Sequence, residues 1–192
     1  MNQRILCYGD SNTYGYDPRS YLGGRYPRSV RWTSLLNVNG WEIINEGENG
    51  RCIPQSGDEI RAAAQSLRST RAEILVMMLG SNDLLRQPVL SAEICARRME
   101  TFLCELQDQV PEAPKILLVA PPPMKPGTWI NDSRTPDESA RLAVCYAELA
   151  KRLGIRFADA GAWNVQLAFD GVHFSEEGHR AFAKGIRKEL WI

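Results

Sequence analysis

Residues 74–80 read ILVMMLG, and residues 115–121 read KILLVAP. Both stretches carry apolar residues at consecutive positions, so a strand formed there would bury side chains on both of its faces. Strands of this kind are typical of a parallel sheet that helices cover on both sides. The two stretches therefore predict that the protein is built around a parallel sheet.

Short apolar runs and longer amphipathic patterns alternate along the whole chain. The predicted strands lie at 5–8, 41–44, 74–79, 116–120 and 155–158. The predicted helices lie near 30–37, 57–70, 91–110, 137–153 and 175–190. This alternation predicts the α/β class, as a three-layer α/β/α sandwich with a five-stranded parallel sheet. The expected strand order is the flavodoxin-like order 2-1-3-4-5. Two segments rich in turn-forming residues, 14–29 and 121–136, are predicted to be loops.

Size and charge set the broad class of the protein. A chain of 192 residues has the length of one globular domain, so we expect residues 1–192 to form a single domain. Lys and Arg number 23 and are balanced by 23 Asp and Glu, which gives a formal net charge of zero. This balance argues against nucleic acid or a membrane as the partner. A homo-oligomer is compatible with the sequence.

Cysteine usage and the N-terminal sequence bear on localisation. The five cysteines include no CxxC pair, which favours reduced thiols and no zinc site. The first residues lack a signal-peptide pattern, and no apolar run is long enough to cross a bilayer. We therefore expect a cytoplasmic protein.

Polar residues follow the predicted strands where their carboxyl ends should meet. The segments are GDSN (9–12) after the first strand, NEGENG (45–50) after the second and GSND (80–83) after the third. DGVH (170–173) precedes the last helix. Ligands of open parallel sheets bind at this edge. Each segment alone is more often an ordinary turn, but their joint appearance favours a catalytic site.

With these segments in the order Ser, Gly, Asn and Asp-x-x-His, the sequence resembles the SGNH (GDSL-like) esterase/lipase superfamily. The opening RILCYGDSNTYGY and the VAPPP at 119–123 resemble its arylesterase and acyltransferase branch in particular. The resemblance implies the SGNH hydrolase fold and a serine esterase acting on short-chain acyl or aryl esters through an acyl-enzyme. It implies no cofactor and no metal ion, and it extends to acyl transfer to alcohols. A carbohydrate O-acetyl esterase of the same fold is an alternative.

The resemblance also implies the roles of single residues. Ser11 is the nucleophile, His173 the general base and acid, and Asp170 the carboxylate that orients the imidazole. The chemistry agrees, because a serine hydroxyl needs an adjacent imidazole and the imidazole needs a group that fixes its tautomer. The oxyanion hole is expected from the backbone N–H groups of Ser11 and Gly50 and the side-chain amide of Asn82.

The substrate is expected to be a small-molecule ester, bound beside the triad and between the predicted loops. The candidate substrate-binding residues are Asp10, Asn12, Trp129, Ile130 and Val172, with Tyr14 and Tyr16 as further lining. Asn12 stands where the family's block has Leu.

Several polar residues also have a structural interpretation. Asp10 and Asp83 are expected to tie down the turns around Ser11 and Asn82. His179 is expected on the surface of the last helix, and Cys52 as a buried thiol. The arginines at 19, 25, 28 and 31 favour a solvated loop over contact with an anionic substrate.

Two rival functions remain at the level of sequence. A metal-dependent phosphohydrolase would have to gather its ligands from Asp10, Asn82, Asp83, Asp170, His173 and His179. Two histidines are few for such a site, and the usual ligand spacings are missing. The other rival is a flavodoxin-like binding module without catalysis, which would leave the four catalytic-type segments unexplained.

Overall fold

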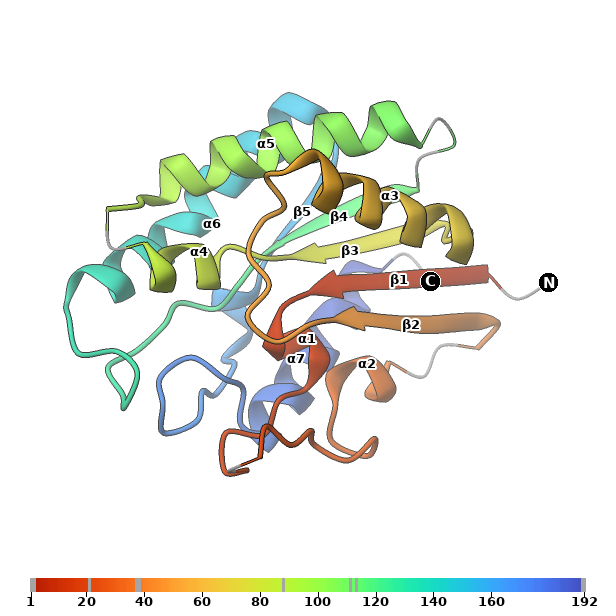
Figure 1. Ribbon diagram of the computed structural model, residues 1–192. Coiled ribbons are helices and arrows are strands. Elements are labelled where there is room, and N and C mark those ends of the chain that lie inside the picture. Colours follow the sequence, from red (N-terminus) through yellow and green to blue (C-terminus); the bar gives the residue numbers. More distant parts are fainter. Residues whose placement is uncertain are drawn as a thin grey trace.

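Five parallel strands form one sheet in the computed structural model, which describes residues 3–20, 22–36, 39–87, 89–110, 112 and 114–190. The strands are β1 (Gln3–Gly9), β2 (Trp41–Gly47), β3 (Ile74–Met78), β4 (Lys115–Ala120) and β5 (Arg156–Asp159). Their order is β2-β1-β3-β4-β5 (Figure 1). The predicted parallel sheet and its strand order are therefore confirmed.

The side chains of β1 alternate between two apolar cores, one on each face of the sheet. Leu6 and Tyr8 pack into the first core, while Ile5 and Cys7 pack into the second. Successive side chains of a strand point to opposite faces. Central strands that are apolar at every position are therefore required to fill both cores, as ILVMMLG is at β3.

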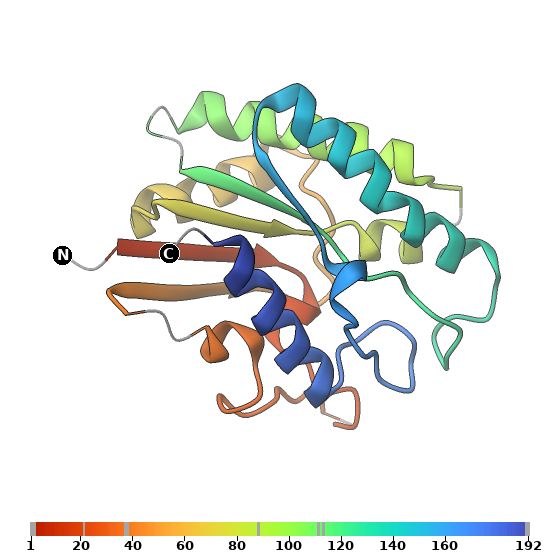
Figure 2. The ribbon, with the colours of Figure 1, turned by 180° about the vertical axis from the view of Figure 1, so that it is seen from behind.

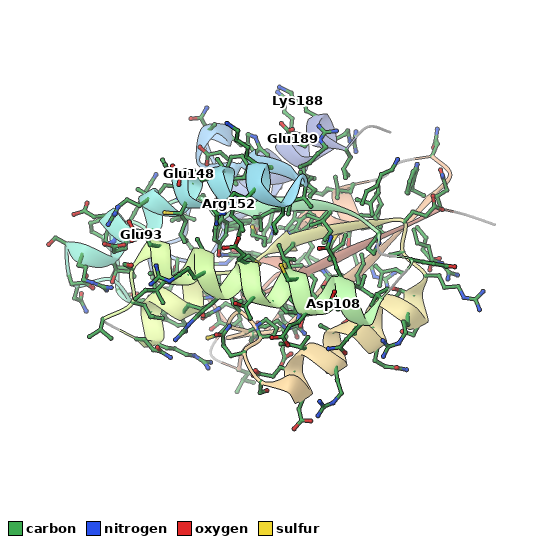
Figure 3. All side chains as sticks on the ribbon, turned by 90° about the horizontal axis from the view of Figure 1, so that it is seen from above. Glu93, Asp108, Glu148, Arg152, Lys188 and Glu189 are labelled. Carbon is green, nitrogen blue, oxygen red and sulfur yellow. The ribbon has the colours of Figure 1, made fainter. Side chains whose placement is uncertain are left out.

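Helices cover both faces and complete the three layers. One face carries α3 (Gly57–Thr70), α4 (Ser81–Arg86), α5 (Ala92–Gln109) and α6 (Arg134–Leu153). The other face carries α2 (Trp32–Leu35), the 3₁₀ helix η1 (Ala160–Trp163) and α7 (Glu176–Glu189), which is prominent in the reverse view (Figure 2). Figure 3 shows Glu148 and Arg152 on the outer side of α6, and Arg152 forms an ion pair with Glu100 of α5.

Two helix boundaries differ from the prediction. Helix α6 begins at Arg134, so residues 134–136 of the predicted loop 121–136 are helical. Pro136 is tolerated there because N–H groups of the first turn have no intrahelical acceptor. Helix α2 covers four residues instead of 30–37, because Arg31 is extended and Leu36 leaves helical geometry. Residue 37 of that prediction lies outside the described residues.

Short helices were missed by the sequence analysis. The four-residue helix α1 (Ser11–Tyr14), α4 and η1 are each too short to show a helical period. Tyr14 therefore belongs to α1 rather than to the predicted loop 14–29, and residue 21 of that loop lies outside the described residues. Across the described ranges, no helix is long and apolar enough to span a membrane.

Candidate active site

Ser11 lies at the carboxyl end of β1, at the first position of helix α1. Asp10 precedes it as the N-cap, and its Oδ1 accepts the Asn12 N–H at 2.9 Å. Burial raises the pKa of Asp10 to about 6, although the hydrogen bond from the Asn12 N–H lowers it. N–H groups in the first turn of a helix have no intrahelical acceptor, so the Ser11 N–H is available to a ligand. Asp10 thus holds the turn that presents Ser11, as predicted.

His173 joins Ser11 to Asp170 through both of its ring nitrogens. Nε2 lies 3.0 Å from Ser11 Oγ, and Nδ1 lies 2.6 Å from Asp170 Oδ2. Asp170 Oδ1 also accepts the N–H groups of Val172 and His173, each at 2.9 Å. Burial alone would raise the pKa of Asp170, but the hydrogen bonds from His173 and from the two N–H groups hold it below its ordinary value. The geometry therefore favours an ionised Asp170 carboxylate behind the imidazole of His173.

The side chain of Asn12 ties the loop around His173 to helix α1. Its Nδ2 donates to the Val172 carbonyl at 3.1 Å, and its Oδ1 accepts the Phe174 N–H at 2.8 Å. Val172 is 5% exposed and Phe174 is fully buried, so neither backbone group could turn to water instead. The replacement of the family's Leu by Asn thus adds two buried hydrogen bonds across the site.

Gly50 and Asn82 line the same cleft as Ser11. Gly50 has a φ of +75°, and a Cβ built on it would come within 2.5 Å of Arg86 Nη2. The positive φ favours glycine at this position, whereas the Arg86 guanidinium is the end of a flexible side chain and could move aside. Asn82 donates one Nδ2 hydrogen to the Arg51 carbonyl at 3.1 Å, which fixes the amide plane and leaves its second N–H for a ligand.

The loop that carries Gly50 is fastened at two points. Arg51 donates to the Gly9 carbonyl at 2.9 Å, and its guanidinium stacks on Tyr8 with 4.1 Å between Cζ and the ring centroid. Asp83 Oδ2 accepts the Ile53 N–H at 3.0 Å, and its Oδ1 lies 3.3 Å from Arg98. Asp83 thus buttresses the loop beside the site, in keeping with its predicted structural role.

A cleft of about 420 Å³ opens over Ser11. It is lined by Ser11, Tyr16, Asn49, Gly50, Asn82, Leu85, Arg86, Trp129 and His173. The Tyr16 and Trp129 rings flank the imidazole of His173, with centroids 4.6 and 4.9 Å from its own. The backbone N–H of Trp129 donates to the Asp170 carbonyl at 3.2 Å and so joins the loop that carries Trp129 to the loop that carries Asp170.

Four predicted substrate-binding residues lie beneath the cleft rather than along it. Asp10 and Asn12 are buried in the hydrogen bonds described above, while Ile130 and Val172 are buried in the first apolar core. Tyr14 also lies outside the lining. Of the five predicted substrate-binding residues, Trp129 is the one that lines the cleft, and contact with the substrate stays a prediction.

Asn49, Leu85 and Arg86 line the cleft although the sequence analysis did not select them. Asn49 directly precedes Gly50, and the other two follow the GSND segment on α4. Their proximity in sequence to those segments could have suggested a place in the cleft. A short helix, however, has no periodic pattern that would show which of its side chains face the cleft.

His179 is not on the helix surface as predicted but fully buried. Its Nδ1 accepts the Trp32 N–H at 3.4 Å, and its ring packs edge-on against Tyr26 and Phe174. Burial, and then the charge of Arg31, lowers the pKa of His179 to about 3. The loop preceding α2 covers this face of α7, which the pattern of α7 alone could not reveal. Cys52, predicted as buried, is half-buried.

The six ligands of the metal-site interpretation do not converge. Asp83 is hydrogen-bonded to Ile53 and Arg98, and His179 packs against Phe174 of the second apolar core. Across the ranges that the structure describes, no group of three or more His, Cys, Asp or Glu side chains could hold a metal ion.

The predicted arginine cluster divides into two parts. Arg19 pairs with Asp17 and Glu176. Arg25, Arg28 and Arg31 line a separate groove that shares no lining residue with the cleft.

Comparisons with known proteins show what the chain as a whole is similar to. The model of the GDSL-like lipase/acylhydrolase family matches residues 7–181. An M. smegmatis aryl esterase structure is similar at 26% identity, with a TM-score of 0.86 and 98% of each chain covered. A carbohydrate acetylesterase family member from Sinorhizobium meliloti is similar at 30% identity and a TM-score of 0.84, over 98% of this chain and 97% of its own. Est24, a carbohydrate acetylesterase from the same organism, is similar at 25% identity and a TM-score of 0.86, over 98% of each chain. A search of curated proteins found no match.

Proposed function

The chain belongs to the GDSL-like lipase/acylhydrolase family within the SGNH hydrolases, and on that premise we propose that Ser11, His173 and Asp170 form the catalytic triad of a serine esterase. The observation that carries the proposal is the unbroken chain of contacts Ser11 Oγ–His173 Nε2–Asp170, with distances of 3.0 and 2.6 Å. The enzyme is a carboxylic ester hydrolase.

In the first step, Ser11 Oγ attacks the ester carbonyl while His173 Nε2 takes the hydroxyl proton. The carbonyl oxygen becomes negative in the tetrahedral intermediate. In this proposal the N–H groups of Ser11 and Gly50 and the side-chain N–H of Asn82 stabilise this oxyanion. Asp170 stays ionised and stabilises the imidazolium that forms.

In the second step, the carbon–oxygen bond to the leaving alcohol breaks, and His173 delivers its proton to that oxygen. The acyl group remains on Ser11. A water molecule then attacks the acyl-enzyme while His173 accepts a proton from it. Collapse of the second intermediate returns the proton to Ser11 Oγ and releases the carboxylic acid.

The volume and the aromatic lining of the cleft favour esters with a short acyl chain and an aromatic alcohol as substrates. A volume of about 420 Å³ is near the lower end of small-molecule sites. The rings of Tyr16 and Trp129 offer apolar faces beside His173, where the leaving group has to lie to receive its proton. An alcohol in place of water would give acyl transfer by the same steps.

Labelling and kinetics test the proposal together. A fluorophosphonate probe should label the parent and the Ser29→Ala control but not Ser11→Ala. Over p-nitrophenyl esters of increasing chain length, kcat/KM should be highest for acetate to butyrate and should not respond to a chelator. Labelling of Ser11→Ala, or loss of activity with the chelator, would contradict the proposal.

Carbohydrate O-acetyl esters are a second candidate substrate, favoured by the likeness to two S. meliloti carbohydrate acetylesterases at 25% and 30% identity. Acetate release from a peracetylated sugar should be compared with hydrolysis of p-nitrophenyl acetate. A higher kcat/KM for the sugar would favour this candidate over aryl esters. Product analysis in the presence of methanol would detect acyl transfer as methyl ester.

A further inference from the structure

A second concave surface lies beside the edge strand β2, away from the catalytic cleft. It has a volume of about 720 Å³, and its lining includes Arg25, Arg28 and Arg31. We call it the arginine groove. It is lined besides by Ser29, Thr33, Ser34, Leu36, Trp41, Ile43 and Asn45.

Helix α1 and its C-cap Gly15 contact two of the three arginine side chains. Arg25 donates its Nε hydrogen to the Tyr14 carbonyl, and its Cζ lies 4.3 Å from the centroid of the Tyr14 ring. The stem of Arg31 packs on Gly15, where an added Cβ would come within 2.6 Å of Arg31 Cγ and Cδ. The groove therefore presents these cations without the full entropic cost of ordering two long side chains.

The positive charge of the groove is not neutralised within the described part of the chain. No Asp or Glu is among its lining residues, and none of the three arginines forms an ion pair with a described residue. Arg31 Nε is buried and has no hydrogen-bond partner there. Burial, followed by the charges of neighbouring arginines, lowers the pKa of Arg31. Three like charges thus repel one another, and a bound anion would relieve this repulsion.

We propose that the arginine groove binds a small, multiply charged oxyanion that carries phosphate groups. Guanidinium groups present forked N–H donors that match phosphate oxygens, and bonds of this kind are among the strongest hydrogen bonds in proteins. The hydroxyls of Ser29 and Ser34 are exposed at the same surface and add neutral donors.

The groove also borders the helix that carries Ser11. Asn45, in its lining, donates to the Thr13 carbonyl at 2.6 Å and to Thr33 Oγ1 at 2.8 Å. An anion held by Arg25 and Arg31 would therefore brace the carboxyl end of α1. Because the two surfaces share no residue, the anion should not compete with the ester.

Isothermal titration calorimetry with inorganic diphosphate, at an ionic strength fixed with sodium chloride, tests the proposal. The parent should bind diphosphate saturably at one site. Arg28 is exposed and contacts no described residue by hydrogen bond or ion pair, so its replacement should leave the fold intact. Arg28→Gln should weaken binding about tenfold and Arg28→Glu about a hundredfold, as expected for loss and reversal of one charged partner.

Matched variants separate the groove from general electrostatics and from the cleft. Arg61→Glu on α3 changes the net charge equally but lies outside the groove, so its affinity for diphosphate should stay within about twofold of the parent. Ser11→Ala should bind diphosphate as the parent does, which keeps this test independent of the esterase proposal. An absence of saturable binding, unchanged affinity in Arg28→Glu, or equal weakening in Arg61→Glu would overturn the proposal.

Discussion

Asn82 shows how one amide can be both fixed and available. One Nδ2 hydrogen bonds to the Arg51 carbonyl at 3.1 Å, so the other hydrogen is aimed without further ordering when the oxyanion forms. A donor that acts on the transition state contributes to kcat rather than to KM. Removing such a donor typically costs roughly 10²–10³ in kcat. We therefore expect Asn82→Ala to lower kcat by that factor and to leave KM nearly unchanged in p-nitrophenyl acetate hydrolysis.

Asn82→Asp distinguishes this role from that of a turn former. A carboxylate places negative charge where the oxyanion must form, so the kcat of this variant should be at least as low as that of Asn82→Ala. An Asn82→Asp enzyme that kept most of the parent's kcat would remove Asn82 from the oxyanion hole.

His179 should contribute to acid sensitivity without taking part in catalysis. Its pKa is lowered from 6.5 to about 3, mainly by burial, so the folded state favours the neutral ring. The unfolded chain therefore binds a proton first, and stability is present above about pH 6.5 and lost as the pH falls toward 3, by up to about 1.4 kcal/mol per pH unit. We expect His179→Gln to flatten the fall in unfolding free energy between pH 6.5 and 4.5, measured by urea denaturation. Equal slopes for parent and variant would show that other groups govern the acid response.

At the level of elements, the short helix α1 depends on its cap. Asp10 Oδ1 accepts the Asn12 N–H, but burial raises the pKa of this carboxyl to about 6. Asp10→Ala should destabilise the protein by about 1 kcal/mol through loss of the cap. Asp10→Asn keeps the acceptor and removes the buried charge. Because the folded pKa exceeds the unfolded one, the parent loses stability as the pH rises from about 4 through 6, whereas the Asn variant should not.

Thermal unfolding of the parent and both variants at pH 4 and pH 8 checks this expectation. The melting temperature of Asp10→Asn minus that of the parent should be larger at pH 8 than at pH 4. At both pH values Asp10→Ala should melt at a lower temperature than Asp10→Asn. An Asn variant as unstable as the Ala variant would show that the cap depends on the charge itself.

Elements differed in how well the sequence predicted them. The all-apolar runs of β3 and β4 have one simple explanation, burial on both faces, and this predicted the parallel sheet correctly. The strand order was expected from the flavodoxin-like arrangement of such sheets and not from the runs themselves. Helices α1 and α4 have four and six residues, too few for a period. Helix α1 is stabilised by its Asp10 cap, and α4 by the contacts of Asn82 and Asp83 with neighbouring segments. Motifs identified Ser11 and Asn82 on these helices, but Leu85 and Arg86, which also line the cleft, were missed for this reason.

At the scale of the molecule, the site joins the two ends of the chain. The sequence brought Ser11, His173 and Asp170 to one edge because strand ends of a parallel sheet meet there, and the structure places them within hydrogen-bonding distance. Sequence alone could not show how the segment that carries His173, about 160 residues further along the chain, is held against the segment that carries Ser11. That depends on side-chain contacts between α1 and the loop before α7.

Asn12 makes those contacts, and its replacement gives a test of the whole arrangement. Asn12→Leu would restore the residue that the family's block carries, yet it would leave the Val172 carbonyl and the Phe174 N–H without partners in a buried place. Each unsatisfied group costs about 1–3 kcal/mol. Asn12→Asp can still accept from Phe174 but cannot donate to Val172, so its loss should be intermediate. If these bonds hold His173 against Ser11, the rate of fluorophosphonate labelling and kcat should both be highest in the parent, lower in Asn12→Asp and lowest in Asn12→Leu. KM should change less than kcat. A loss of melting temperature in Asn12→Leu with an unchanged labelling rate would mean that Asn12 stabilises the fold and leaves the alignment of the triad to Asp170.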